Sequence, residues 1–194
     1  MKNLQVRIKT DLSTEPVSST EAKLFCKVTG STEDALFVIL IKSAREALEK
    51  YTSSSFGEKT IHTTWLHMPT DQLLEIPYGP IISVDAVYRI DEEGTETALV
   101  LNTDYWVYGD QDAVIKVSTL WLSGLKATAS LRVEYTAGYG HENTETLPSA
   151  LKQAILKQIV TDYEMREDIS TEGGTVLSNG SKKLASNYRK KLWF

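Results

Sequence analysis

The chain lacks several features that would place it in a well-defined chemical class. Its 194 residues include a single cysteine, Cys26, which excludes an intrachain disulfide and a cysteine-based zinc cluster. No apolar run reaches the roughly 18 residues that a membrane helix needs, so we expect no membrane partner. The opening MKNLQVRIKTDL alternates polar and apolar residues and lacks the apolar centre of a signal peptide.

Negative charge outweighs positive charge over most of the chain. The formal net charge is −5, which argues against general nucleic-acid binding through a basic surface. The exception is the segment 173–194, which has five basic residues and no acidic one, so that the remainder carries −10. We expect this basic tail either to dock on an acidic surface or to remain a solvated terminus.

The rest of the composition is ordinary for a globular protein. The chain is 41% hydrophobic and 24% charged, at a length sufficient for one substantial core or two small ones. A capping-box pattern at Ser18 and Glu21 predicts a short helix that ends near Gly30. A second helix is predicted from Ser31 to about Tyr51. Its predicted apolar stripe consists of Leu36, Ile39, Leu40, Ser43, Ala44, Ala47, Leu48 and Tyr51.

The first half of that second helix is apolar on every side, because 35–41 is an unbroken apolar run. A helix of this kind needs cover on more than one side. Either the β-rich part of the chain or another copy of the protein would supply that cover.

The middle of the chain, from about Lys59 to Tyr139, is rich in strand patterns. The segment 91–94 indicates a hairpin turn, and further strands are predicted at 97–101, 105–107 and 113–117. Because no helical pattern intervenes, we expect a mainly antiparallel sheet. Alternation in ISVDAVYRI places on one face the residues Ile82, Val84, Ala86, Tyr88 and Ile90.

The stretch 130–163 joins the β region to a helix. Alternation predicts a strand with Leu131, Val133 and Tyr135 on one face, and the glycines of TAGYG end it. Pro148 begins a helix that is predicted to run to about Glu167. The apolar face of that helix consists of Leu151, Ala154, Ile155 and Ile159. A last short helix is predicted from 179–181 to near Lys191.

These patterns predict an α+β fold, in which both ends of the chain form a small helical domain with an inserted, mainly antiparallel β-rich region. The predicted divisions are an N-terminal helical part at 1–58, the β insertion at 59–140, a C-terminal helix at 141–172 and the basic tail at 173–194.

Candidate chemical groups are few and poorly placed. His62 and His67 are five residues apart in a predicted strand and therefore on opposite faces, which makes them poor joint metal ligands. His141 beside Glu142 has no residue to orient it as an acid–base pair. Cys26 lies among apolar neighbours, as a core thiol does. We therefore predict no enzyme, no catalytic residue, no metal site and no cofactor.

Aromatic residues of the β region allow two interpretations. They would either pack in the core, which we favour for a sheet, or form a stacking platform for sugars or bases. The residues concerned are Trp65, Tyr105, Trp106, Tyr108 and Trp121.

Four segments of the chain occur in an informative order. EPVSSTEAKLFCKV is followed by STEDALFVILIKSAREALEKYTSSSF, then by the proline-rich strand entry and acidic hairpin IPYGPIISVDAVYRIDEEGTE. RVEYTAGYG with LPSALKQAILKQIVTDYEMRED supplies a final strand, turn and proline-led helix. The ordered set, covering most of residues 14–168, resembles the head–tail connector (adaptor) proteins of tailed bacteriophages, in the form that carries a β-rich insertion.

The resemblance implies a structural virion protein rather than an enzyme. Such proteins form a ring, usually dodecameric, beneath the portal protein, where they extend the DNA channel and dock the next neck or tail-completion protein. The implied location is the virion neck, and the host cytoplasm during assembly. DNA would pass without specific binding, which an acidic body suits. The free protein could still be a monomer, because some assembly proteins wait for a partner to order them.

Two sets of residues are predicted to make assembly contacts. The predicted subunit contacts are Phe37, Val38, Ile41, Lys152, Lys157, Asp162 and Glu164. The predicted portal-docking residues are Lys182, Lys183, Arg189, Lys190, Lys191, Trp193 and Phe194. Deleting residues 182–194 is expected to abolish portal association while leaving the fold intact.

Two other functions stay open at this point. One is a β-rich carbohydrate- or receptor-binding module of a virion, which would use the tryptophans. The other is a small hydrolase that uses His141.

Overall fold

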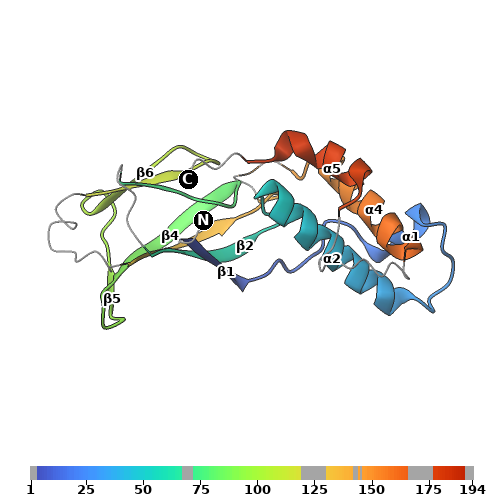
Figure 1. Ribbon diagram of the computed structural model, residues 1–194, viewed down its shortest axis with the longest axis horizontal. Coiled ribbons are helices and arrows are strands. Elements are labelled where there is room, and N and C mark those ends of the chain that lie inside the picture. The colour runs from blue at the N-terminus through green and yellow to red at the C-terminus, as the bar shows by residue number, and fades with distance from the viewer. Residues whose placement is uncertain are drawn as a thin grey trace.

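The computed structural model describes residues 4–66, 72–118, 130–141, 144, 146–165 and 177–190. The molecule is elongated, with its helices gathered at one end and its strands at the other (Figure 1). Each end has its own hydrophobic core, and the predicted α+β class is confirmed. The residue ranges of the four predicted divisions stay a prediction.

The helices begin close to their predicted positions. In the described residues they are α1 (Ser19–Phe25), α2 (Asp34–Thr52), α4 (Ser149–Glu164) and α5 (Asn179–Ala185), with a 3-10 turn at Ser186–Tyr188. The predicted capping box opens α1, since the Glu21 amide donates to Ser18 Oγ at 3.2 Å and the Ser18 amide donates to Glu21 Oε2 at 2.9 Å. Helices from both ends of the chain pack together, as predicted.

The buried face of α2 differs from the predicted stripe. Phe37 and Ile41 are buried, whereas Ile39, which the stripe included, is 66% exposed. Phe37 stacks on Tyr163 of α4, with ring centroids 5.2 Å apart. The prediction for Ile39 is therefore wrong. In a run that is apolar on all sides, periodicity does not select the face, and the packing of α4 decides it instead.

The larger sheet consists entirely of antiparallel neighbours. In spatial order, its strands in the described residues are β1 (Leu4–Thr10), β2 (Lys59–Trp65), β8 (Ser130–Ala137), β4 (Ile81–Ile90) and β5 (Glu96–Ala98). The sequence did not predict β1 as a strand. It precedes the helices in the chain but crosses to the β end, where it forms one edge of this sheet (Figure 1).

The central strand β8 follows its predicted alternation. Leu131, Val133 and Tyr135 are buried, and the residues between them are only partly buried. Because partners flank β8 on both sides, its alternation is fixed by two neighbouring strands at once.

The neighbouring strand β4 departs from its predicted alternation. Ile81 and Val87 are its buried residues, an even number apart, although a face of even-numbered residues from 82 to 90 was predicted. The register against β8 shifts between Ile81 and Ser83 and again between Val84 and Ala86. Residues 82–86 keep the predicted alternation, with 82, 84 and 86 partly buried and 83 and 85 exposed. At Val87 the buried side changes, because such bulges re-aim the side chains that follow, so the prediction of one face over the whole strand is wrong.

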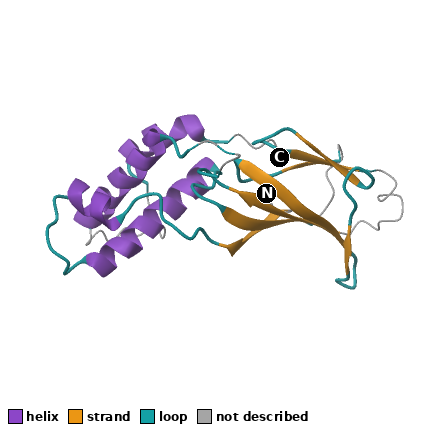
Figure 2. Ribbon diagram, turned by 180° about the vertical axis from the view of Figure 1, so that it is seen from behind, coloured by secondary structure: helices purple, strands orange, loops and turns teal. Residues whose placement is uncertain are grey.

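A smaller sheet covers one face of the larger one (Figure 2). Its strands, in spatial order, are β3 (Leu73–Glu75), β7 (Val114–Val117) and β6 (Tyr105–Tyr108). The hydrophobic core between the sheets includes Ile61, Trp65, Leu74, Ile115, Val133 and Tyr135. The predicted hairpin turn links β4 and β5, where the Gly94 amide donates to the Asp91 carbonyl at 3.1 Å.

Gly138 lies where the β end returns the chain to the helical end. Its φ is 149°, and its amide donates to the Pro80 carbonyl at 2.8 Å. A Cβ at this position would lie 2.0 Å from the carbonyl oxygen of Gly57. The glycine is therefore required both by backbone conformation and by the close approach of two chain segments.

Candidate assembly surfaces

A buried cluster of charges connects the two ends of the molecule. Arg45 of α2 is fully buried and donates hydrogen bonds to three carboxylates, with the carboxylate of Glu46 also 3.9 Å away. Its Nε donates to Glu15 Oε2 at 2.8 Å, and its terminal nitrogens donate to Glu49 at 2.8 Å and to Asp11 at 3.2 Å. Lys59 of β2 binds Glu49 at 2.6 Å and Asp11 at 3.1 Å. The segment after β1, helix α2 and strand β2 are thus tied to one another.

The pKa values follow from this arrangement. Burial alone would raise the pKa of Asp11, yet hydrogen bonds from Lys59 and the Leu12 amide, with the charge of Arg45, lower it to about 2. Burial opposes the charge of Arg45 as well, but the hydrogen bond to Glu15 and the charge of Glu49 raise its pKa. Asp11 and Arg45 therefore both stay ionised at neutral pH. The cluster holds the segment after β1, helix α2 and strand β2 together through paired charges.

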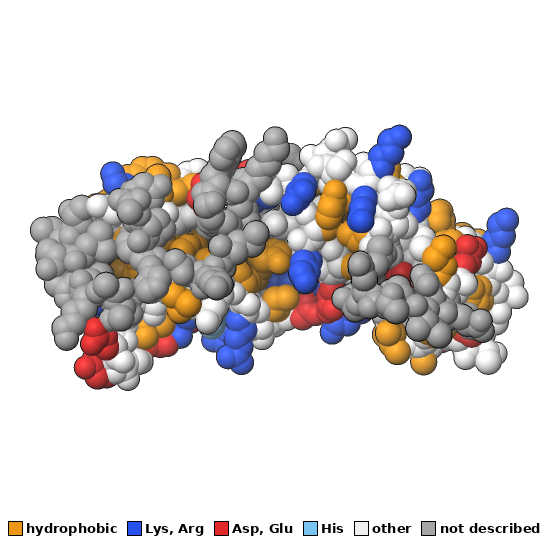
Figure 3. All heavy atoms as spheres, in the orientation of Figure 1, with side chains coloured by type: hydrophobic (Ala, Val, Ile, Leu, Met, Phe, Trp, Pro, Cys, Tyr) orange, Lys and Arg blue, Asp and Glu red, His pale blue; other side chains and the backbone are white. Residues whose placement is uncertain are grey.

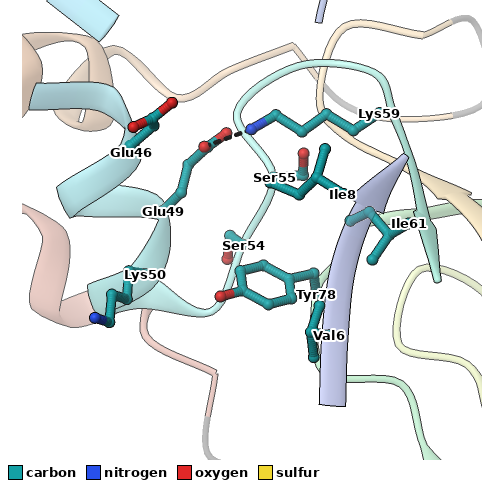
Figure 4. Close-up of a pocket in the computed structure, with 10 residues that line it drawn as sticks. All are labelled: Val6, Ile8, Glu46, Glu49, Lys50, Ser54, Ser55, Lys59, Ile61 and Tyr78. Atoms are coloured by element: carbon teal, nitrogen blue, oxygen red, sulfur yellow. Dashed lines mark hydrogen bonds and ion pairs between the residues drawn. The ribbon is translucent and has the colours of Figure 1, made fainter. Parts of the chain in front are cut away.

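A hollow of about 400 Å³ lies beside this cluster, between β1 and the end of α2 (Figure 4). Val6 and Ile8 of β1 line one side, and Tyr78 lies between them and the helix. The two buried charges at its wall, Glu49 and Lys59, bind each other. The hollow is thus apolar on the side of β1 and Tyr78, and polar on the side of α2, where Glu46, Lys50, Ser54 and Ser55 also line it.

The predicted subunit contacts on α2 are divided by the fold. Phe37 and Ile41 belong to the chain's own helical core, whereas Val38 is 58% exposed. Ile39 is also exposed on this helix, and Leu24 on α1 is 78% exposed. Val38 is thus the predicted contact on α2 that the surface offers to another molecule.

Predicted contacts on α4 are largely engaged within the chain. Lys152 Nζ binds Glu21 Oε1 at 2.6 Å, which connects α4 to α1. Asp162 accepts a hydrogen bond from the buried Gln158 at 2.8 Å. Burial raises the pKa of Asp162, and that hydrogen bond partly offsets the rise. Lys157 is half-buried beside α5, and Glu164 is exposed at the end of α4.

The Lys152–Glu21 ion pair gives the protein a measurable acid response. Hydrogen bonds from Lys152 and Ser18 lower the pKa of Glu21 to about 2, from 4.5. Since the folded form binds this proton less readily, the stabilisation is present above pH 4.5 and is lost as the pH falls towards 2. Glu21→Gln should lower Tm by only about 2 °C at pH 7, because the pair is partly exposed. The loss should be smaller at pH 3, where part of the stabilisation by the ion pair is already gone.

Thermal unfolding of Glu21→Gln and of the control Glu58→Gln, measured between pH 7 and pH 3, tests this expectation. Glu58 is exposed, and within the described residues it forms no ion pair. An equal loss for Glu21→Gln at both pH values would contradict the ion-pair explanation.

The described part of the basic tail packs against the helical end, and its last residue, Lys190, contacts the β end. Basic side chains gather over α5 in Figure 3. Lys190 Nζ binds Asp112 at 2.9 Å and the Ile76 carbonyl at 3.0 Å, and Arg189 lies over the ring of Tyr51. Lys183 is exposed and Lys182 is partly exposed. The predicted docking residues Lys191, Trp193 and Phe194 lie outside the described residues.

The sequence predicted that deleting residues 182–194 would leave the fold intact. The packing of this segment corrects that prediction. Ala185 is fully buried in the helical core, and Leu184 and Tyr188 pack against that core. Ser181, just before the deletion, is also buried and donates to the Ala154 carbonyl at 3.0 Å. Removing the segment would expose the helical core, so point substitutions are needed to test docking.

Of the candidate chemical groups, His62, His141 and Cys26 lie in the described part of the chain. Burial lowers the pKa of His62, which lies 3.4 Å from Glu134 on β8, and His67 lies outside the described residues. Burial raises the pKa of the Cys26 thiol. No three His, Cys, Asp or Glu side chains are grouped to hold a metal ion in the part of the chain that the structure describes.

Two of the five aromatic residues of the β region are buried, and Trp106 is half-buried. Trp65 and Tyr105 are buried in the core between the sheets, whereas Tyr108 is 53% exposed. Trp121 lies outside the described residues.

Among the helices described, none combines the length and apolar character of a membrane span.

Sequence reasoning missed the two features that depend on the distant parts of the chain. One feature of the sequence could have indicated the charge cluster: Arg45 and Glu49 have opposite charge and are four residues apart, on the side of α2 that is buried. For β1, the signal was the alternation of polar and apolar residues near the N-terminus.

Comparisons with known proteins find likeness in fold alone. No family model matches the chain, and no curated protein matches it. A chain in a structure described as the virion of a native gene transfer agent (GTA) particle is 18% identical, with a TM-score of 0.71. Chains from the neck of an empty GTA particle, computed with C6 symmetry, and of a native one, computed with C12 symmetry, are each 19% identical, with TM-scores of 0.69 and 0.61. In all three cases the match covers 98% of this chain and 97% of the other.

Proposed function

We propose that the protein is a structural component of a virion neck, a head–tail connector that forms a ring below the portal protein. In this role it extends the DNA channel and docks the next neck or tail-completion protein, without catalysing a reaction. DNA passes through the ring without specific binding. The protein is made in the host cytoplasm and ends in the neck of the particle.

The observation that carries this proposal is the end-to-end match to chains of phage-like particles. Coverage of 98% of this chain and 97% of the matched chains means that the helical end and the β end are matched together, rather than one common module. Two of those structures are necks computed with C6 and C12 symmetry, which supports a ring, and a dodecamer in particular.

The surface of the protein is compatible with this role. Its net charge of −5 does not favour a grip on DNA phosphates. Val38, exposed on α2, is the residue we retain as a subunit contact at the helical end. Lys157 and Glu164 of α4 are proposed for the same contact, and Lys182 with Lys183 of α5 for portal docking, because the other predicted residues are engaged within the chain or lie outside its described part.

The proposal is tested by sedimentation of the purified protein with the portal protein of its source genome. The wild-type protein should co-sediment as a ring, even if it is a monomer alone. Lys182→Glu with Lys183→Glu should weaken portal binding at least about tenfold, through loss of electrostatic attraction. Val38→Asp in the same assay should reduce ring mass.

Lys27→Glu with Lys116→Glu is the matched control, because it reverses two exposed charges away from α5. It should bind the portal like the wild-type protein. A wild-type protein that never joins the portal would overturn the proposed function, and equal binding by both charge variants would overturn only the docking role of α5.

A further inference from the structure

The two edges of the larger sheet carry opposite charge. Strand β1, at one edge, contains Arg7 and Lys9 and no acidic residue. The other edge is β5 with the turn that precedes it, and the segment 91–98 contains four acidic residues and no basic one. In Figure 3, acidic side chains gather at this hairpin, at the lower left, and basic side chains lie at the lower margin near β1.

At each edge, some of the charged side chains form no ion pair within the described residues. In the described residues, Arg7 and Lys9 are exposed and form no ion pair. Glu96 of β5 binds Arg132, with Nη2 and Oε2 2.6 Å apart, but Glu93 in the turn is exposed. The excess negative charge therefore lies at the turn, and the excess positive charge lies on β1.

Exposed aliphatic side chains accompany each charge. On β1, Val6 is 40% and Ile8 is 50% exposed, beside the hollow at the end of α2. Directly after β5, Val100 is 58% and Leu101 is 49% exposed. The β1 edge thus offers apolar and basic side chains side by side, whereas the β5 edge offers an acidic turn before the strand and exposed aliphatic side chains after it. Apolar area and complementary charge are both used by protein interfaces.

We propose that the β1 edge of one copy lies against the β5 edge and residues 99–101 of the next copy in the ring. The occupant of each edge is therefore a second copy of this chain, selected by charge complementarity. Because the two surfaces differ and lie at opposite edges of one sheet, the contact is heterologous and repeats head to tail, as a ring requires. This inference rests on the proposed ring.

The dimensions suit a dodecamer. Five strands are separated by four spacings of about 4.8 Å, and one further spacing to the neighbouring copy gives about 24 Å per copy. With this width per copy, twelve copies give a ring whose circumference is about 290 Å and whose radius, measured at the sheets, is about 45 Å. A ring of that radius leaves an open centre for a channel.

Two charge-reversal variants test the contact. Because a mixture of the two is expected to assemble, a failure of either variant to fold can be told apart from a loss of the contact. Arg7→Glu with Lys9→Glu makes both edges acidic, and Glu92→Lys with Glu93→Lys makes the turn before β5 basic and cancels the net negative charge of 91–98. Each variant alone should require at least about a tenfold higher concentration for assembly, in the presence of portal protein, than the wild type. An equimolar mixture should assemble normally, because the acidic β1 of one variant then meets the basic turn of the other.

The ring is detected by its sedimentation and by light scattering, with Lys27→Glu/Lys116→Glu as a charge-matched control. A mixture that stays unassembled, or an Arg7→Glu/Lys9→Glu variant that assembles like the wild type, would overturn the contact while the ring itself stands. If the wild type and the control also form no ring, the proposed function fails together with the contact. The two failures are therefore distinguishable.

Discussion

Replacing Arg45 with methionine should lower the free energy of unfolding by about 3 to 5 kcal/mol, the usual cost of removing one partner of a buried ion pair. Arg45 is fully buried among carboxylates of Asp11, Glu15 and Glu49. Without its guanidinium, Asp11 and Glu49 would keep Lys59 as their buried cation, and Glu15 would lose the cation that it binds in the cluster. The loss should appear in urea denaturation as a lower midpoint.

Lys42→Met is the matched control for this variant. Lys42 lies on the same helix and also approaches Asp11, at 3.6 Å, but its side chain is 55% exposed. Its replacement should change the free energy of unfolding by no more than about 1 kcal/mol. Equal effects of the two substitutions would show that burial of the cluster does not govern its contribution.

Gly138→Ala should lower the free energy of unfolding by about 4 kcal/mol, from backbone strain and overpacking together. The new Cβ would lie 2.0 Å from the Gly57 carbonyl oxygen, and φ is 149°. Neither atom is the end of a flexible side chain, so the two segments must move apart. The hydrogen bond from the Gly138 amide to Pro80, 2.8 Å long, would be strained with them.

Gly140→Ala separates the two causes, because Gly140 lies in the same turn. Its φ is 89°, but a Cβ there meets nothing within 4 Å. It should therefore cost about 1 kcal/mol, from conformation alone. If Gly138→Ala were no more destabilising than Gly140→Ala in urea denaturation, the close approach to Gly57 would not be what selects glycine at position 138.

Local sequence patterns predicted an element correctly where the packing of the rest of the chain favours the same structure as the pattern. The capping box at Ser18 and the proline at Pro148 act within one turn of backbone, and both helices begin as predicted. The alternation of β8 was reliable because partner strands flank it on both sides. The α+β class followed from the order of these elements.

The errors arose where distant residues decide the local structure. Bulges in β4 depend on its partner strand, and the face of α2 depends on α4, so neither can be read from one period. The burial of Arg45 contradicts the usual exposure of arginine, and only the three-dimensional meeting of its partners explains it. Residue-level assembly contacts depend on other molecules and stay predictions.

The central claim, a ring-forming neck component, is tested most directly by electron cryomicroscopy of the protein bound to its portal protein. The account predicts a twelvefold ring coaxial with the portal, on its tail-facing side, around an open channel. Within that ring, the sheets of neighbouring copies should meet edge to edge. Density for single copies scattered on the portal without rotational symmetry, or no bound protein at saturating concentration, would contradict it.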